Sequence, residues 1–297
     1  MQNRQPTLSF LLSAFCLLSL ATADWALAQT TPATPFRSRR TEDDPKGPAI
    51  IIPRSQLTAL REKVARTKPA ASPLPAGWSK RSTDWPRVMA IFAPLRLRRG
   101  YVLRAYQYNT LDAGASFVWA MPETADFPEP NDCPRWQEHP LHPPRPSSAL
   151  EVMEAIEGDG SPWSYACASI LKRELEEYGA RERGCDWLLH RLLDQNPWKT
   201  DLVVENLSPI EGPTGKADRW TWLAREPQQW SPHVRTTMDR VQVFFCSYCG
   251  LGKQTIYRQT DTYRRGAYRF TTERTAIVEG PKGFVHPELI QKSRSSR

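Results

Sequence analysis

The most regular alternation of apolar and polar positions in the chain lies between Ser161 and Gly179. Apolar residues recur there at steps of three and four, from Trp163 to Tyr178, which predicts an amphipathic helix. Ser161 suits the N-cap, Pro162 suits the first helical position, and Gly179 favours termination. The charged residues should lie mostly on the solvent-facing side: Lys172, Arg173, Glu176 and Glu177. We expect this helix to cover a sheet.

Three shorter stretches also have patterns typical of helices. Residues 55–67 carry apolar positions three and four apart. Residues 148–157 begin with Ser148 and Glu151, whose spacing is that of a capping box. Residues 186–194 are rich in leucine and end before a proline, which predicts a further short helix.

Runs rich in β-branched and aromatic residues predict strands before and after these helices. The candidate strands are 88–92, 101–108, 116–121, 201–206, 220–224, 240–246, 255–263 and 267–278. Hairpin turns are expected at 111–115 and 265–266. This order of elements predicts an α+β fold. We expect a mainly antiparallel sheet, built from the strands within 85–121 and 201–278 and covered by helices within 148–195.

The N-terminus has the pattern of an export signal. Arg4 precedes an apolar run at residues 8–21, and Ala26 and Ala28 occupy the positions that a signal peptidase recognises. The run is shorter than the ~20 residues that span a bilayer, so we expect cleavage rather than retention as a membrane anchor. The mature chain is then predicted to be soluble, secreted or periplasmic, and without a transmembrane segment.

Composition divides the chain into further segments. We expect a signal peptide at 1–28, a disordered leader at 29–49, a short helix and Pro-rich linker at 50–80, a single α+β domain at 81–290 and a basic tail at 291–297. The predicted domain is long enough to bury a substantial core of its own.

Charge and tryptophan content bear on the partners of the protein. The net charge is +8, and it stays +8 without residues 1–28 because that segment holds one Arg and one Asp. In an exported protein, a positive balance favours anionic polysaccharide, peptidoglycan or lipid head groups over nucleic acid. The 11 tryptophans suit either a core or a surface that binds sugars or peptides.

One predicted hairpin interleaves aromatic and cationic residues, and it is the main candidate for binding an anion. Its candidate binding residues are Tyr257, Arg258, Tyr263, Arg264, Arg265, Tyr268 and Arg269. An ordinary hairpin with tyrosines inward and arginines outward explains the same pattern. A second candidate surface is a groove around Trp119, Trp136 and Trp163, which would suit a secreted hydrolase.

Cys246 and Cys249 form a C-x-x-C motif that we predict at a hairpin tip. The pair is compatible with a redox site, with half of a zinc site, or with a structural disulfide, local or to Cys133 or Cys185. Zinc would need ligands from distant parts of the chain: Cys133, Cys185, His139 or His142. A disulfide or plain thiols are favoured, and zinc is the one cofactor that the sequence leaves open.

Two further groups of residues have side chains of the types that act as general acids or bases, but neither group forms a complete set of catalytic residues. His190 follows Asp186 by one helical turn and could be a general base, although a partly buried histidine bonded to a helical neighbour explains it as well. Glu151, Glu154 and Glu157 recur every three residues with Asp159 beyond. Glycoside cleavage needs carboxylates that face each other, so a solvated helix face is the better interpretation.

Residues 85–195 contain five distinctive blocks: residues 100–107, 117–122, 127–133, 158–165 and 173–177. These blocks resemble an uncharacterised family of secreted cyanobacterial proteins. The resemblance implies export and no assigned activity, and no site residue is carried over from it.

The leading hypothesis from the sequence is a secreted, soluble, non-catalytic protein that binds or scaffolds an anionic component of the cell envelope. One alternative is a secreted hydrolase with a Trp-rich groove. Another is a thiol or zinc protein that uses Cys246 and Cys249. The first hypothesis is favoured because it explains the export signal and the positive charge together.

Overall fold

The computed structural model describes residues 48–68, 76–109, 113–134, 142–179, 181–182, 187–198, 213 and 219–284. These residues all belong to one unit of the chain, Pro45–Arg297. Several predicted features lie outside the described residues: the signal peptide, nearly all of the leader, most of the Pro-rich linker, the strand at 201–206 and the basic tail.

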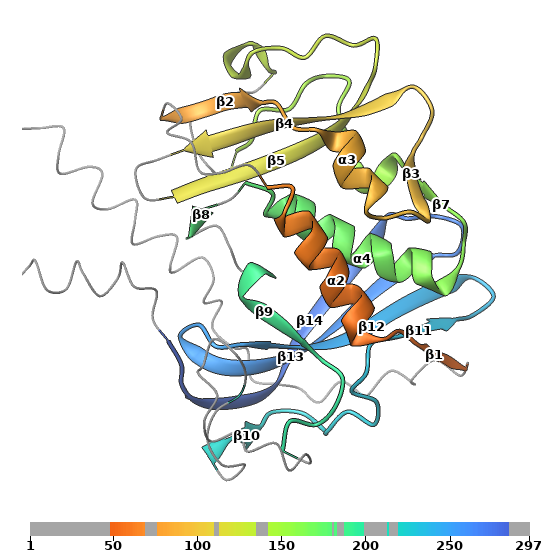
Figure 1. Cartoon of the computed structure of the whole chain (residues 1–297), viewed down its shortest axis with the longest axis vertical. Coiled ribbons are helices and arrows are strands. Elements are labelled where there is room, and N and C mark those ends of the chain that lie inside the picture. Colours follow the sequence, from red (N-terminus) through yellow and green to blue (C-terminus); the bar gives the residue numbers. More distant parts are fainter. Residues whose placement is uncertain are drawn as a thin grey trace, which may run out of the picture. The chain divides into compact units, whose positions relative to one another are not determined.

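Two antiparallel sheets carry most of the structure (Figure 1). The large sheet contains β1 (Ala49–Ile51), β11 (His233–Thr236), β12 (Arg240–Cys249), β13 (Lys253–Arg264), β14 (Phe270–Lys282) and β10 (Thr221–Trp222) in this order, with β9 (His190–Leu193) also paired to β12. The small sheet contains β2 (Gly77–Arg81), β4 (Tyr101–Asn109), β5 (Ala113–Pro122) and β6 (Leu150–Glu151), with β8 (Arg181–Glu182) paired to β5. β3 (Leu95–Leu97) and β7 (Ile156–Gly158) form a separate pair.

The helices lie between the two sheets, as Figure 1 shows for α2 and α4. The α-helices among the described residues are α2 (Arg54–Ala65), α3 (Trp85–Ala90) and α4 (Pro162–Glu176). Short 3-10 turns are η1 (Pro130–Asp132), η2 (Val152–Glu154) and η3 (Trp187–Leu189). α4 contacts β5 of the small sheet and β11 and β12 of the large sheet, and α2 packs against α4. The predicted helix at 55–67 is therefore confirmed and docks on the main body.

The central helix α4 begins and ends where its sequence predicts. Ser164 N donates to the side chain of Ser161 at 3.1 Å, Pro162 occupies the first turn, and Gly179 has a φ of +88° just beyond the end. The predicted solvent-facing side is wrong in part, because Arg173 and Glu177 are buried. A helix between two sheets buries both of its sides, so these charges need partners inside the protein.

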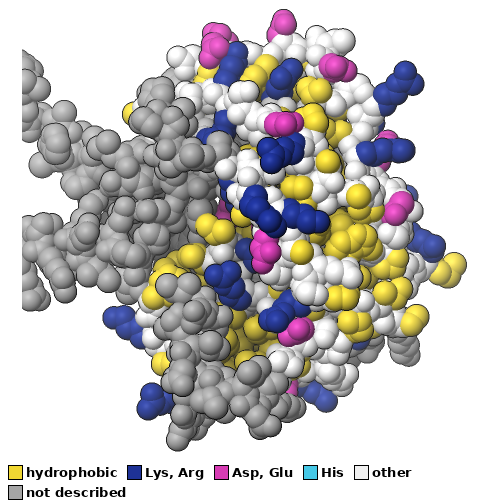
Figure 2. Space-filling view, in the orientation of Figure 1, with side chains coloured by type: hydrophobic (Ala, Val, Ile, Leu, Met, Phe, Trp, Pro, Cys, Tyr) yellow, Lys and Arg dark blue, Asp and Glu magenta, His cyan; other side chains and the backbone are white. Residues whose placement is uncertain are grey.

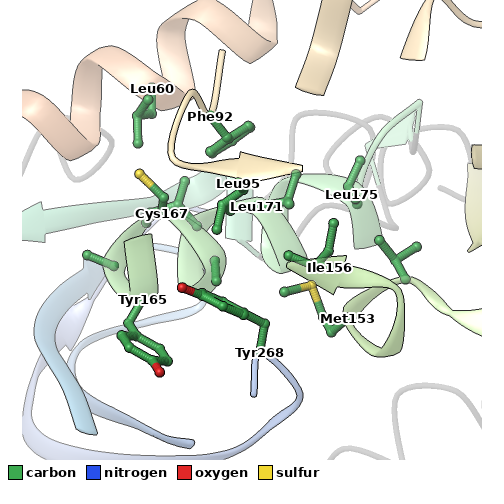
Figure 3. Close-up of a cluster of buried hydrophobic side chains, with 14 of the residues drawn as sticks. Leu60, Phe92, Leu95, Met153, Ile156, Tyr165, Cys167, Leu171, Leu175 and Tyr268 are labelled. Atoms are coloured by element: carbon green, nitrogen blue, oxygen red, sulfur yellow. The ribbon is translucent and has the colours of Figure 1, made fainter. Parts of the chain in front are cut away.

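A single core joins the helices to both sheets. Figure 3 shows Leu60 of α2, Phe92 after α3, and Leu171 of α4 within it. Tyr165 of α4 stacks on Tyr268, with ring centroids 4.9 Å apart and ring planes at 14°. The core explains why the two sheets and the helices form one unit.

The strand predicted at 88–92 is wrong, since the chain forms α3 there. Arg87 N donates to the side chain of Asp84 at 3.1 Å, which caps the helix, and a proline occupies its first turn. Val88 and Phe92 lie four residues apart and are both buried in the core. The apolar run is too short to distinguish this helical spacing from a strand.

Two predicted helices are also wrong. Residues 148–157 form β6, η2 and part of β7, and the capping box joins Glu151 to Glu154 around a single 3-10 turn. Residues 187–193 form η3 and then β9. Leu192 and Leu193 point into two different apolar clusters, so β9 is apolar on both faces and its leucine run resembles a buried helix.

The fold class is confirmed at the level of a mainly antiparallel sheet. The hairpin of β4 and β5 is present, with Asn109 opposite Gly114. The chain is richer in sheet than a balanced α+β protein, because two of the expected helices are strands and 3-10 turns. The strands predicted within 101–121 and within 220–278 form separate sheets with α4 between them, where a single covered sheet was expected.

Candidate functional site

The large sheet has one face toward α4 and one face away from it. Val241, Val243 and Phe245 of β12 are buried in the core that α4 completes, so the alternate positions of β12 point the other way. Residues directly opposite each other on neighbouring strands lie on the same face of a sheet, so the residues of the other strands that face away from α4 can be identified from their partners on β12. We define the outer face by Arg235, Arg240, Gln242, Phe244, Arg258, Thr260, Thr262, Arg264, Thr271, Glu273 and Thr275. Its charged residues are four arginines and one glutamate.

One end of the outer face places two arginines side by side. Arg240 and Arg264 are cross-strand partners, and like charges directly opposite each other destabilise a sheet. Asp239 lies 3.3 Å from Arg240, between Oδ2 and Nε, and neutralises part of this charge. Arg264 and Arg265 make no side-chain hydrogen bond or ion pair with any residue that the structure describes.

The same end contains a cavity of about 550 Å³. Its walls come from the turn between β11 and β12 and from the end of β13: Met238, Asp239, Arg240, Thr262, Tyr263, Arg264 and Arg265. Three arginines and one aspartate leave it positively charged. Met238 at its rim is 93 % exposed. The cavity therefore offers unneutralised guanidinium groups to an anion.

The predicted hairpin residues divide between the two faces. Tyr263 and Tyr268 are buried against α4, where their hydroxyls lie 2.7 Å from Ser169 Oγ and 2.6 Å from Ser164 Oγ. Burial raises the pKa of Tyr263 well above its usual range. Tyr257 is half-buried under the guanidinium of Arg274, 4.0 Å from the ring centroid. The tyrosines thus follow the alternative prediction of inward-facing rings.

The hairpin arginines remain exposed, but they do not all join the site. Arg258 and Arg264 lie on the outer face, and Arg265 lies in the adjoining turn. Arg269 instead forms an ion pair with Glu154, with Nη1 2.8 Å from Oε1. The structure therefore retains three of the four predicted arginines as candidates.

Overall charge does not mark the site. On the face of the molecule shown in Figure 2, Lys and Arg side chains are spread over the described surface, with Asp and Glu among them. The local arrangement of the arginines on the outer face is therefore more informative than the net charge of +8.

The tryptophans of the predicted groove do not form one. Trp119 is buried in a cluster with Tyr106 and Met121, and its indole N–H donates to Pro144 O at 2.9 Å. Trp163 packs against the main core instead. Trp136 lies outside the described residues, as does His139.

A different group of tryptophans lies on the outer-face side of the large sheet. Trp198, Trp220, Trp222 and Trp230 contact one another with centroid distances of 5.2 to 6.4 Å. They cover Cys246 and Tyr248 of β12 together with residues of β13 and β14. The W-x-W spacing at 220–222 is a sequence signal for this cluster, although only the folded chain brings Trp198 to it.

The C-x-x-C motif lies within β12 and not at a hairpin tip. Side chains three residues apart on a strand point to opposite faces, so Cys246 and Cys249 are directed away from each other. No disulfide joins the described cysteines Cys133, Cys167, Cys246 and Cys249 to one another. Burial raises the pKa of Cys246 to about 12, which keeps its thiol protonated. Cys185 lies outside the described residues.

The metal and thiol hypothesis receives no support from this arrangement. Cys133 is buried beside Tyr106, with its sulfur 3.3 Å from the hydroxyl, far along the chain from the motif. Within the described ranges, no three His, Cys, Asp or Glu side chains converge as a metal site would need.

His190 is buried in β9 at the centre of a polar network. Its Nδ1 lies 2.9 Å from Ser247 Oγ, and its Nε2 lies 3.1 Å from Arg274 Nη2. A guanidinium only donates, so Nε2 accepts and Nδ1 carries the proton. Gln259 donates to Ser247 Oγ at 3.0 Å and accepts from Arg173 at 3.1 Å. The network connects the strands of the large sheet to α4.

A cavity of about 220 Å³ opens beside this network. It is lined by Lys172, Arg173, Glu176, Glu177, Trp187, His190, Gln259, Thr272 and Arg274. The carboxylates of the hydrolase hypothesis are not among these residues. Glu154 pairs with Arg269 and Glu157 pairs with Arg96, at 2.8 Å and 3.1 Å. Asp186, the predicted partner of His190, lies outside the described residues.

Compared with protein-family models, with curated proteins and with solved structures, the chain shows no match. Among the described helices, none has both the length and the apolar character needed to cross a bilayer. Function is therefore inferred from the chain's own geometry.

Proposed function

We propose that this protein is an exported, non-catalytic protein whose outer face binds an anionic polysaccharide of the cell envelope. The observation that carries the proposal is the cross-strand pair Arg240–Arg264 at the positively charged cavity. Two adjacent guanidinium groups repel each other in the free protein, and a bound carboxylate or sulfate would relieve that repulsion.

The spacing of charges favours a linear ligand. Arg258 and Arg264 lie six residues apart on one strand, which corresponds to about 20 Å at ~3.4 Å per residue. A chain with repeated negative charges can contact both positions at once, whereas a single small anion contacts one. Thr260 and Thr262 lie between them on the same face and can hydrogen-bond sugar hydroxyls.

The His190 network supports a binding role over catalysis. Ser247, whose hydroxyl lies 2.9 Å from His190 Nδ1, is fully buried. It already accepts a hydrogen bond from Gln259. A nucleophile must reach a substrate carbonyl, and this serine is enclosed by the strands that flank it.

The test measures binding of the purified full chain to polygalacturonate, to neutral dextran and to phosphatidylglycerol vesicles at low and high salt. Arg240→Glu/Arg264→Glu should weaken polygalacturonate binding about tenfold or more at low salt, because it reverses two charges at the site. The matched control is Arg99→Glu/Arg104→Glu, which makes the same charge change at exposed positions near and on the small sheet. The control should retain binding within about threefold.

Three outcomes would overturn the proposal. Equal losses in the two double variants would show that only net charge matters. Binding to the vesicles but not to polygalacturonate would assign the face to lipid head groups. Failure of the wild-type chain to bind polygalacturonate at low salt would remove the polysaccharide altogether.

A further inference from the structure

The cluster of Trp198, Trp220, Trp222 and Trp230 has features that a purely structural core does not explain. Trp222 is 40 % exposed although its three neighbours are largely covered, and Leu223 beside it is 49 % exposed. Burying large aromatic surface is favourable, so an aromatic ring left open at the edge of a cluster is available to a partner.

Two hydrogen-bond donors in the cluster find no acceptor among the described residues. The indole N–H groups of Trp198 and Trp230 are buried, and neither has a hydrogen-bond partner in the part of the chain that the structure describes. Trp230 as a whole is only 7 % exposed. A buried donor without an acceptor lowers stability, so each such group calls for an explanation. Rules of local structure are broken most often at functional sites, so these unsatisfied donors mark the cluster as a candidate site.

The rings are arranged around Trp222. Its centroid lies 5.9 Å from that of Trp198 and 6.4 Å from that of Trp230, and the ring planes meet at 67° and 78°. Both neighbours therefore stand nearly perpendicular to Trp222 and support it at fixed orientation. A flat, partly exposed ring held in this way can stack against the C–H face of a pyranose.

The cross-strand register places Trp222 on the outer face. Trp222 is opposite Val278, Val278 is opposite Ile256, and Ile256 is opposite Tyr248. Tyr248 and Arg240 are eight residues apart on β12, so they share a face. Trp222 thus lies on the same side of the sheet as the arginine pair.

The distance between the two sites suits one extended ligand. Ile256 and Arg264 lie eight residues apart on β13, which corresponds to about 27 Å at ~3.4 Å per residue. Arg258 lies between them, next to the covered part of the sheet. A linear chain on this path meets the tryptophan ring at one end and the guanidinium pair at the other.

We propose that Trp222, supported by Trp198 and Trp230, is a sugar-ring subsite of the outer face that stacks on an uncharged face of a pyranose. The subsite rests on the proposed binding of an anionic polysaccharide and divides that binding into two kinds of contact. Stacking on Trp222 does not depend on salt, whereas the arginine contacts weaken as salt screens them.

The experiment compares polygalacturonate binding by wild type, Trp222→Ala, Trp222→Phe and Arg240→Glu/Arg264→Glu across a series of salt concentrations. Trp222→Ala should lower affinity about tenfold at every salt concentration and leave the salt dependence unchanged. Trp222→Phe keeps an aromatic ring and should recover much of the loss. The arginine variant should instead flatten the salt dependence.

The matched control is Leu223→Ala, which removes a similarly exposed apolar side chain without a flat ring. It should bind as the wild type does, and circular dichroism confirms that each variant is folded. A Trp222→Ala variant with unchanged affinity, or a Leu223→Ala variant with an equal loss, would overturn the subsite while the arginine variant still tests the proposed function. A wild-type chain that does not bind at all would instead overturn the proposed function.

Discussion

The ion pair between Arg173 and Asp261 joins α4 to the large sheet inside the protein. Arg173 Nη1 and Nη2 lie 2.6 Å and 2.8 Å from the two carboxylate oxygens of Asp261. Asp261 is 0 % exposed and Arg173 is 7 % exposed. Arg173 also donates to Ser169 O, and Asp261 accepts from Thr272. The pair is bidentate, buried and hydrogen-bonded to its surroundings.

The predicted perturbation is Asp261→Asn, which keeps the shape of the side chain and removes its charge. It leaves the guanidinium buried without a counter-charge, and removal of one partner of a buried pair costs about 3–5 kcal/mol. The attraction itself is about 4 kcal/mol for charges 4 Å apart at an effective dielectric constant of about 20. We therefore expect the free energy of unfolding to fall by about 3–5 kcal/mol, a large part of the roughly 5–15 kcal/mol typical of a domain.

Urea-induced equilibrium unfolding, followed by circular dichroism, measures this difference. The control is Lys172→Gln, which breaks the neighbouring pair Lys172–Glu176 on the exposed side of the same helix. An exposed i,i+4 pair is worth about 0.3–0.5 kcal/mol, so this variant should unfold almost as the wild type does. The double variant Arg173→Met/Asp261→Leu should recover part of the loss, since it leaves no buried charge.

A decrease of less than about 1 kcal/mol in the free energy of unfolding of Asp261→Asn would refute this prediction, because a buried guanidinium without a counter-charge should destabilise the protein by more than that. The prediction is also refuted if the changes in the free energy of unfolding caused by Arg173→Met and by Asp261→Leu simply add in the double variant. Contacting residues of one network should show a coupling energy of about 2 kcal/mol.

Two further predictions concern burial in the large sheet and α4. Burial raises the pKa of Cys167 and Cys246 from 9.0 to about 12, so both folded thiols hold their protons more tightly than unfolded ones. Their contribution to the free energy of unfolding is complete below pH ~9 and is lost toward pH ~12, at about 1.4 kcal/mol per pH unit for each thiol. Urea unfolding of Cys246→Ala between pH 9 and 11 should therefore show a smaller loss of stability with pH than the wild type does. An unchanged slope of stability against pH would contradict this. In Gly280→Ala the new Cβ would lie 2.6 Å from the ring of Trp220. Thermal unfolding should therefore show that the free energy of unfolding falls by about 1–3 kcal/mol. A variant as stable as the wild type would show that Trp220 moves freely.

Local signals predict the elements whose ends are marked by side chains near in sequence. Ser161, Pro162 and Gly179 set the limits of α4, because capping and termination act within one turn. The hairpin of β4 and β5 follows from two runs of strand-forming residues on either side of a short predicted turn. The inward tyrosines and outward arginines of β13 also follow from a period of two along a strand.

Predictions fail where a segment has too few residues to reveal its period or is covered on both sides. β9 alternates between two apolar clusters, so nothing in its leucine run distinguishes it from a helix. Cys246 and Cys249 look like a chelating pair until the strand directs them to opposite faces. The candidate site is predicted only in part: the sequence points to Arg258, Arg264 and Arg265 but not to Arg240 as a cross-strand partner.

The sequence by itself determined the periodic parts of this protein: the limits of α4, the long strands β12, β13 and β14, and the exposed arginines of the hairpin. Those features depend on residues within a few positions of one another. Only the tertiary structure decided that α4 lies between two sheets, that Arg173 is buried with Asp261, and that Trp198 reaches Trp220 and Trp222. These pairings join residues far apart in the chain, and they form because burying both sides of α4, together with one face and part of the other face of the large sheet, fixes the neighbours of each such side chain.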